Sequence, residues 1–236
     1  MTIYSTGVAY LALFIALGFL TFRFFQYWIV KRDTTSKLFF LFSFFLSLFA
    51  LVRTISIWFF ADNTQILVNS IVAVAFFESL AAAIIASLII HLKFPKISPW
   101  IGFLVIFALG ILITAMSTQI SYDPSIGKGG AIDWGFPGSK IGTIYSLLRM
   151  GLILVTFFPL IVIIFQQFKK TTDPDFKKRS LGLVVALILE VGVGFIDFIL
   201  NSLFNLDVIY RDYTIIILSF FIFLTIFFTQ KPESRT

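Results

Sequence analysis

The chain has no cysteine, only one histidine and few charged residues. Without cysteine it has no disulfide, no thiolate nucleophile, no iron–sulfur cluster and no Cys-based zinc site. The single histidine, His91, is too few for a bis-histidine haem or an intramembrane zinc hydrolase site. Every lysine lies in a loop, at the end of an apolar run or in the tail, so no amine is placed for a retinal Schiff base. We therefore expect no metal, no cofactor and no enzymatic activity.

Long apolar runs fill most of what remains. Hydrophobic residues make up 59% of the chain and charged residues 13%. Seven runs each hold at least ~18 mostly apolar residues, which is the length that crosses ~30 Å of hydrocarbon as a helix. They do not alternate with a period of two, which disfavours a barrel. The sequence predicts an all-α integral membrane protein, a single domain over 1–236 with spans at 7–30, 38–61, 66–91, 99–118, 141–168, 180–204 and 213–230.

The basic residues are distributed unevenly between the loops. Twelve of the 18 follow the first, third and fifth spans or lie in the tail, whereas the other side has only Lys128, Lys140 and Arg211. Basic residues near span ends are retained in the cytoplasm, so we expect the N-terminus outside and the C-terminus inside. This topology accounts for the excess of basic residues in the chain, and no nucleic-acid interface is predicted. The basic loops are expected to contact membrane lipid headgroups.

Five ionisable residues lie at membrane depth: Arg53, Glu78, Arg149, Glu190 and Asp197. Charges there cost several kcal/mol unless they are paired, so they face the bundle interior and mark a site by default. The sixth span places four residues on one face by i, i+4, i+7, i+11 spacing, namely Glu190, Gly194, Asp197 and Asn201. On the fifth span Tyr145 lies one turn before Arg149. We expect a polar layer from the membrane centre towards the outer surface.

Two interpretations of this layer remain open. In the first, two Arg–carboxylate pairs fasten the second, third, fifth and sixth spans together, and the fifth charge is a protonated acid. In the second, the charges form the floor of a ligand cavity that is open to the outside. The long external loop 119–140 would then be a lid, with Tyr122, Trp134 and Phe136 covering the ligand. Its Pro and Gly residues predict turns or coil rather than helix.

Three functions fit such a bundle. The first is a sensor or receptor that binds a small-molecule ligand in the outer cavity. The second is a proton- or cation-coupled transporter or channel that uses the intramembrane carboxylates, although no inverted repeat is visible. The third is a non-catalytic accessory subunit of a membrane complex. No pairing of a nucleophile with a base favours an enzyme.

The segment from Tyr145 through the charged connector DPDFKKRS to Gly182 resembles the seven-helix sensor region of some prokaryotic histidine kinases and related signalling proteins. The resemblance implies a prokaryotic plasma membrane and signalling through the cytoplasmic loop 169–180, KKTTDPDFKKRS. In that family a kinase or cyclase domain follows the last span, but here the sequence reads KPESRT. We therefore expect the output to reach a separate cytoplasmic or membrane partner, or to belong to a longer parent protein.

Overall fold

The computed structural model describes residues 3–135, 140–197 and 207–230. Helices dominate this part of the chain: α1 (Ser5–Lys31), α2 (Thr34–Phe60), α3 (Thr64–Lys93), α4 (Pro99–Ser117), α5 (Lys140–Lys170), α6 (Pro174–Phe195) and α8 (Val208–Thr229). Between α4 and α5 lies a small antiparallel hairpin, formed by β1 (Ser125–Ile126) and β2 (Ile132–Asp133) around the 3₁₀ turn η1 (Lys128–Gly130). The predicted turn structure of loop 119–140 is confirmed where the structure describes it.

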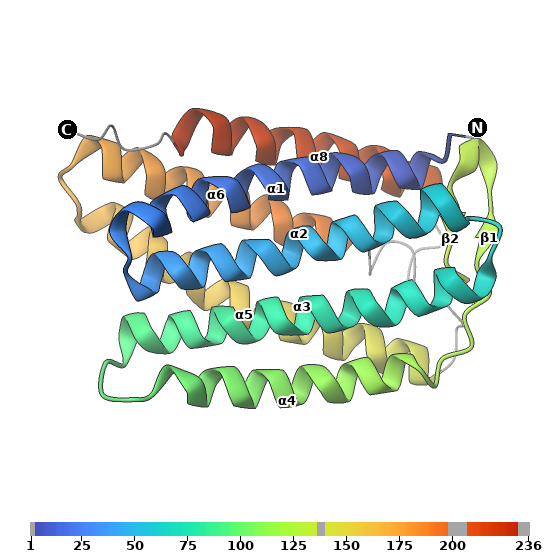
Figure 1. Cartoon of the computed structure of the whole chain (residues 1–236), viewed down its shortest axis with the longest axis horizontal. Coiled ribbons are helices and arrows are strands. Elements are labelled where there is room, and N and C mark those ends of the chain that lie inside the picture. Colours follow the sequence, from blue (N-terminus) through green and yellow to red (C-terminus); the bar gives the residue numbers. More distant parts are fainter. Residues whose placement is uncertain (1–2, 136–139, 198–206, 231–236) are drawn as a thin grey trace.

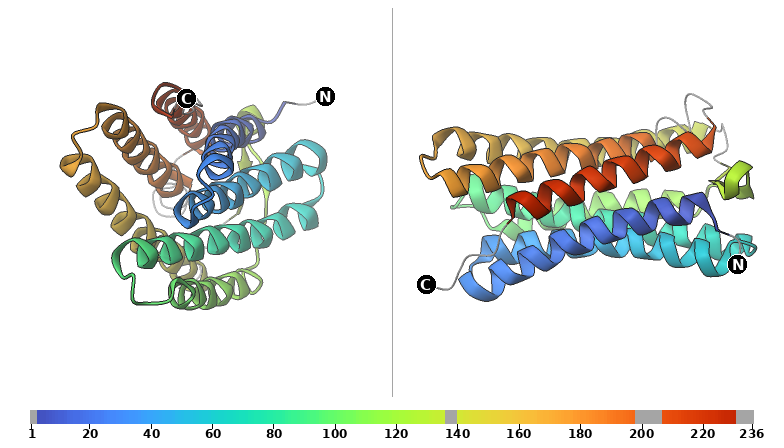
Figure 2. Two further views of the ribbon diagram at one scale, coloured as in Figure 1. Left: turned by 60° about the vertical axis from the view of Figure 1, so that its left-hand side comes forward. Right: turned by 90° about the horizontal axis from the view of Figure 1, so that it is seen from above.

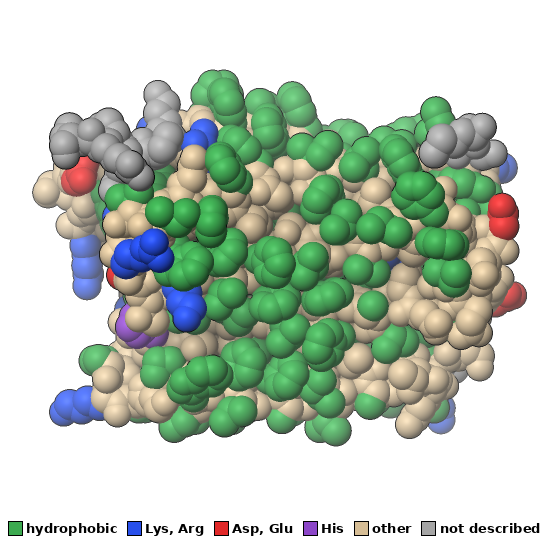
Figure 3. Space-filling model, viewed as in Figure 1, with side chains coloured by type: hydrophobic (Ala, Val, Ile, Leu, Met, Phe, Trp, Pro, Cys, Tyr) green, Lys and Arg blue, Asp and Glu red, His purple; other side chains and the backbone are tan. Residues whose placement is uncertain are grey.

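Six of the helices, all but α6, are long and apolar enough to cross a membrane. Large apolar side chains are exposed along their middles, as at Leu104, Leu112 and Phe158. On the face in Figure 3 these side chains form a wide belt, and Lys and Arg gather mainly at one end. The molecule is thus a helical, multi-pass membrane protein. The described α6 begins at Pro174 and not, as predicted, at residue 180, because the Asp173 carboxylate caps it. Most of the predicted loop 169–180 is therefore helical, and only residues 171–173 separate α5 from α6. Residues 198–204 of the predicted sixth span lie outside the described part.

Polar side chains cap several of the helices at their first turns. The carboxylate of Asp33 accepts a hydrogen bond from the backbone N–H of Ser36 at 2.7 Å, and the amide oxygen of Asn63 accepts one from that of Ile66 at 3.1 Å. Asp207 caps α8 in the same way. α8 therefore begins at Val208 and not, as predicted, at residue 213. Arg211 and Asp212, which we assigned to an external loop, lie in its first turns.

The helices form a ring. Around it α1 packs on α2, α2 on α3, α3 on α5, α5 on α6, α6 on α8 and α8 back on α1. α4 lies outside this ring against α3 and α5, as the view along the bundle in Figure 2 shows. α1 begins beside the hairpin, and α8 ends at the opposite end of the bundle (Figure 1). Side chains of α1, α2, α3, α5 and α6 line the central space, together with Ile113 of α4.

α3 and α4 approach closely because small residues meet between them. A Cβ atom added at Gly110 would overlap the side chain of Ser79, whereas one added at Gly18 of α1 would meet nothing within 4 Å. A side chain forced into a packed site costs typically 1–3 kcal/mol.

We expect Gly110→Leu to lower the free energy of unfolding by about 2 kcal/mol or more, because α4 must move off α3. The matched substitution Gly18→Leu should be neutral or mildly stabilising, since leucine favours helix over glycine. Tryptophan fluorescence during thermal unfolding in lipid nanodiscs measures both. Equal midpoints for the two variants would contradict the close α3–α4 contact.

Candidate functional site

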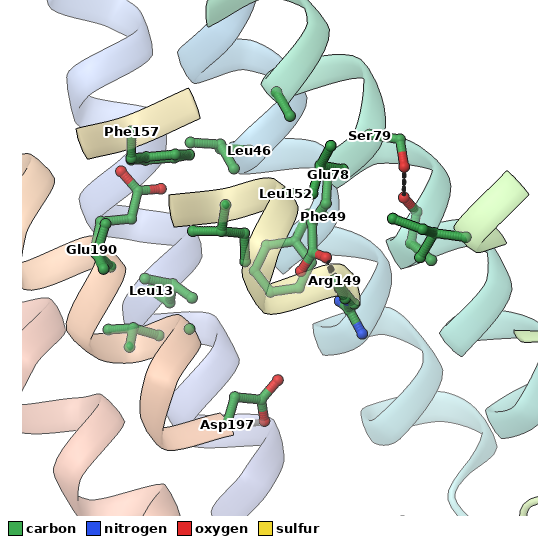
Figure 4. A pocket seen from close by; sticks show the side chains of 17 residues that line it. Leu13, Leu46, Phe49, Glu78, Ser79, Arg149, Leu152, Phe157, Glu190 and Asp197 are labelled. Carbon is green, nitrogen blue, oxygen red and sulfur yellow. Dashed lines mark hydrogen bonds and ion pairs between the residues drawn. The ribbon is translucent and has the colours of Figure 1, made fainter. Parts of the chain in front are cut away.

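A central cavity lies inside the ring and is lined by residues of α1 to α6. Its walls are mostly aliphatic and aromatic, but four ionisable side chains reach it: Glu78, Arg149, Glu190 and Asp197. Figure 4 shows these four from three different helices around the apolar lining. The space inside that is open to the centre of a water molecule is ≈ 50 Å³. One water needs ~10–15 Å³ by such a measure, so the cavity has room for a few waters or a small polar group.

Arg149 of α5 forms a buried ion pair with Glu78 of α3. The guanidinium also donates a hydrogen bond to the Tyr145 hydroxyl, at 3.3 Å and one helical turn away. Arg149 is only 3% exposed and Tyr145 is fully buried. Because each charge lacks water, the pair depends on its mutual contact. This is the one predicted Arg–carboxylate pair that the described residues contain.

Asp197 is paired differently from what we predicted. Its carboxylate accepts a hydrogen bond at 2.8 Å from the hydroxyl of Tyr10, a fully buried residue of α1. Arg53 makes no ion pair within the described ranges. Its guanidinium lies 3.9 Å from the centroid of the Trp134 ring and makes a long 3.4 Å contact with the Ser70 hydroxyl. A desolvated cation–π contact contributes ~2 kcal/mol, which supports an arginine that is 3% exposed.

Glu190 stands apart from these pairs. It is on the cavity wall about two helical turns before Asp197, near Leu46 and Phe157 in Figure 4. Among the described residues none forms a hydrogen bond or ion pair with it. A carboxylate in such surroundings costs several kcal/mol unless it gains a cation or a proton. Glu190 is therefore the cavity group with unused binding capacity.

The predicted face of the sixth span is brought together as far as the structure describes it. Glu190, Gly194 and Asp197 all line the cavity, as i, i+4, i+7 spacing requires. Asn201 lies outside the described residues, as does Phe136 of the predicted lid.

The other two lid aromatics cover the two arginines. Trp134 is buried against Arg53. Tyr122 is also buried and lies near Tyr145 and Arg149. Burial raises the pKa of the Tyr122 phenol above its ordinary value, and Tyr145 adds to the shift. The hairpin region thus lies directly on the polar layer, whereas the covering of a ligand by these side chains stays a prediction.

Aromatic and aliphatic residues close the other end of the cavity. Phe42 of α2 and Phe157 of α5 meet edge to face, with ring centroids 5.6 Å apart. Leu46, one turn after Phe42, lines the cavity with Phe157. Both Phe42 and Phe157 are buried. In the described part of the chain, the polar layer thus ends at an apolar floor.

Sequence reasoning missed a second polar cluster at the outer end, formed by Thr6, Arg211, Asp212 and the backbone of Ile132. Asp212 accepts hydrogen bonds from Thr6 and Ser5, both at 2.7 Å, and it forms an ion pair with Arg211 at 2.9 Å. Thr6 in turn accepts from the Ile132 N–H at 2.8 Å, and Arg211 donates to the Ile132 carbonyl at 3.0 Å.

This outer cluster ties α1, α8 and the hairpin together. Arg211 is 4% exposed and Asp212 is fully buried, so both are structural members of the bundle rather than loop charges. The helix-capping aspartate at 207 is the sequence signal that would have placed them in a helix. The fold and the site define a helical membrane-spanning protein with a mostly apolar central cavity that four ionisable side chains reach. No family model matches the sequence, and no curated protein matches it.

Breaking the central ion pair should destabilise the bundle strongly. We expect Arg149→Met alone to cost about 3–5 kcal/mol, because it leaves Glu78 buried without its cation. Adding Glu78→Gln should recover part of that loss, since both charges are then gone. Unfolding in nanodiscs of the two single variants, the double variant and the parent measures the coupling. Strictly additive losses would contradict the pair.

The outer cluster predicts a local effect of Thr6→Val. The substitution removes a donor to Asp212 and the acceptor for the Ile132 N–H, each worth ~1–3 kcal/mol when left unsatisfied in a buried site. Amide hydrogen exchange at Ile132 should accelerate. Thr214→Val is the matched control, because the Thr214 hydroxyl bonds only the carbonyl of Tyr210 in its own helix. An unchanged exchange rate of the Ile132 amide in Thr6→Val would contradict the role of Thr6 in the outer cluster.

Proposed function

We propose that the protein is a receptor-like membrane protein that binds a small ligand in the central cavity. The observation that carries this proposal is Glu190, a carboxyl group on the cavity wall for which the described residues supply no partner. Glu78 already has Arg149 and Asp197 has Tyr10, so within the described residues Glu190 is the carboxyl of the cavity left for a ligand; in the purely structural interpretation it would instead stay a protonated acid. A ligand with a cationic or hydrogen-bond-donating group would satisfy it.

The proposal includes seven spans, an external N-terminus and a plasma membrane. In that orientation the hairpin is outside, and the basic segment 169–180 faces the cytoplasm. Gln230, which follows α8, donates a hydrogen bond at 2.9 Å to the carbonyl of Arg179 in α6. The inner ends of α6 and α8 are therefore tied together beside that segment. A ligand that shifts α6 at Glu190 would move this junction, which supports the basic segment 169–180, at the turn between α5 and α6, as the contact for a partner protein.

Proton- or cation-coupled transport is the second candidate. Three carboxyl groups in one membrane-embedded cavity favour it. The apolar layer of Phe42 and Phe157 argues against it, because ions need a polar or hydrated path to both sides. An accessory-subunit role has only the apolar surface in its support, and we rank it third.

Native mass spectrometry of gently purified protein tests the ligand proposal. The wild type and the control Asp62→Asn, at an exposed external aspartate, should retain a small molecule that Glu190→Gln loses. The loss of one charge-assisted contact weakens binding roughly tenfold or more.

A chemical probe complements this measurement. Dicyclohexylcarbodiimide should modify Glu190, and methylammonium should slow the modification by occupying the cavity. Thermal unfolding of each variant verifies that it is folded. A wild type without any bound molecule, together with no protection by methylammonium, would refute ligand binding at Glu190.

A further inference from the structure

Both ends of the central cavity are covered by packed side chains in the described part of the chain. Towards the hairpin, Trp134 and Tyr122 lie buried over the two arginines. Towards the other end, Phe42 and Phe157 form the apolar floor. Within the described residues, a ligand that arrives from water would have to pass these side chains. The side wall of the bundle offers a different route.

An apolar groove runs along the membrane-facing surface between α4 and α5. Its lining includes Leu109, Leu112, Leu147, Gly151 and Val155, and the space in it that is open to the centre of a water molecule is ≈ 540 Å³. Charged residues are absent from its lining. In a bilayer such a groove is filled by hydrocarbon rather than water.

The groove and the central cavity share two wall residues, Ile113 of α4 and Leu152 of α5. Both side chains are buried, and each contributes to both spaces. A single layer of side chains therefore separates the bilayer-facing groove from the charged cavity. α4 lies outside the ring of helices and contacts only α3 and α5 among the helix pairs with substantial contact, so a shift of α4 would part these two side chains without opening the ring. The two side chains are therefore the place where the cavity and the groove adjoin.

The central cavity and the groove differ in size, so each suits a different part of a ligand. The cavity, at ≈ 50 Å³, accommodates an ammonium group with one or two waters but no long chain. The groove, at ≈ 540 Å³ by the same measure, accommodates a single hydrocarbon chain. A molecule with a small polar head and one apolar chain would fit both at once.

The charged residues in the cavity determine which charge the polar head group of a ligand should carry. Arg149 is engaged by Glu78, and Asp197 accepts from Tyr10. Glu190 is the remaining charged group on the wall, and an anionic head would lie in the field of three carboxyls. A protonated amine instead pairs with Glu190 and offsets the desolvation of its carboxylate.

We propose that the ligand is a single-chain amphiphile with a protonated amine head, which enters from the bilayer between α4 and α5. Its chain lies in the groove, its head binds Glu190, and the Ile113 and Leu152 side chains form the gate between them. This inference rests on the proposed ligand binding in the central cavity and names the ligand class and its route.

The test uses a hexadecylamine with a photoactivatable diazirine near the end of its chain, with the protein in phosphatidylcholine nanodiscs. Matched diazirine probes are hexadecanol and phosphatidylcholine. We expect the amine probe to label peptides of α4 and α5 at the groove at least tenfold more than the other two, and unlabelled hexadecylamine to compete. Glu190→Gln should reduce the labelling by roughly tenfold, the loss of one charge-assisted contact.

Gly151→Leu tests the route. A Cβ atom at Gly151 meets nothing within 4 Å, so the larger side chain fills the groove without a clash at its attachment point. It should abolish labelling by the amine probe yet leave methylammonium protection of Glu190 intact. Gly18→Leu is the matched control at another open glycine and should behave as wild type.

The outcomes separate the two proposals. Equal labelling by all three probes would mean that the groove takes any bilayer chain, and it would overturn the amphiphile inference. Methylammonium protection with no effect of Gly151→Leu on the amine probe would overturn the lateral route while keeping the cavity as a ligand site. Failure of both methylammonium protection and amine labelling would overturn the proposed function as well.

Discussion

The structure depends on the inability of hydrocarbon to hydrogen-bond. A polar group at membrane depth is stabilised only by partners inside the protein or by a bound ligand, because the lipid offers none. The Arg149–Glu78 pair shows the consequence most directly. A guanidinium and a carboxylate from two helices form an ion pair because the surrounding lipid and apolar side chains cannot stabilise either charge alone. The same requirement draws Asp197 to Tyr10 and Arg53 to the face of Trp134. The ring of helices surrounds these contacts and leaves its apolar side chains to the lipid.

The sequence predicted most of the helices and the buried charged residues, but few of the contacts that those residues make. Runs of apolar residues placed most helices to within a few residues, and helical spacing alone aligned Glu190 with Asp197. The partner of Asp197 is 187 residues away in the sequence, and nothing local to either residue indicates it. Arg53 was expected to meet a carboxylate because charge attracts charge, but an indole ring serves when the arginine is desolvated. Asp207, a helix cap, was taken for a loop residue, and Arg211 and Asp212 were misplaced with it.

The cavity combines two kinds of chemistry in a small volume. Its polar groups come from three helices, and two of its carboxyls are already engaged, so a ligand would act on the third. α6 carries that third carboxyl and is bonded at its other end to the segment after α8. α4, in contrast, touches the ring from outside and borders the bilayer-facing groove. The helix that would admit a ligand and the helix that would respond to it are therefore different.

The outer cluster imposes an order on assembly. Thr6 and Asp212 are separated by 206 positions, yet they share a buried hydrogen bond. Chains are synthesised from the N-terminus, so α1 enters the membrane long before its partner exists. Until α8 arrives, Thr6 has only the hairpin to bond, and the ring lacks the helix that joins α6 to α1. The ring thus closes only when α8 is inserted between α6 and α1, and a chain interrupted before α8 keeps an open side.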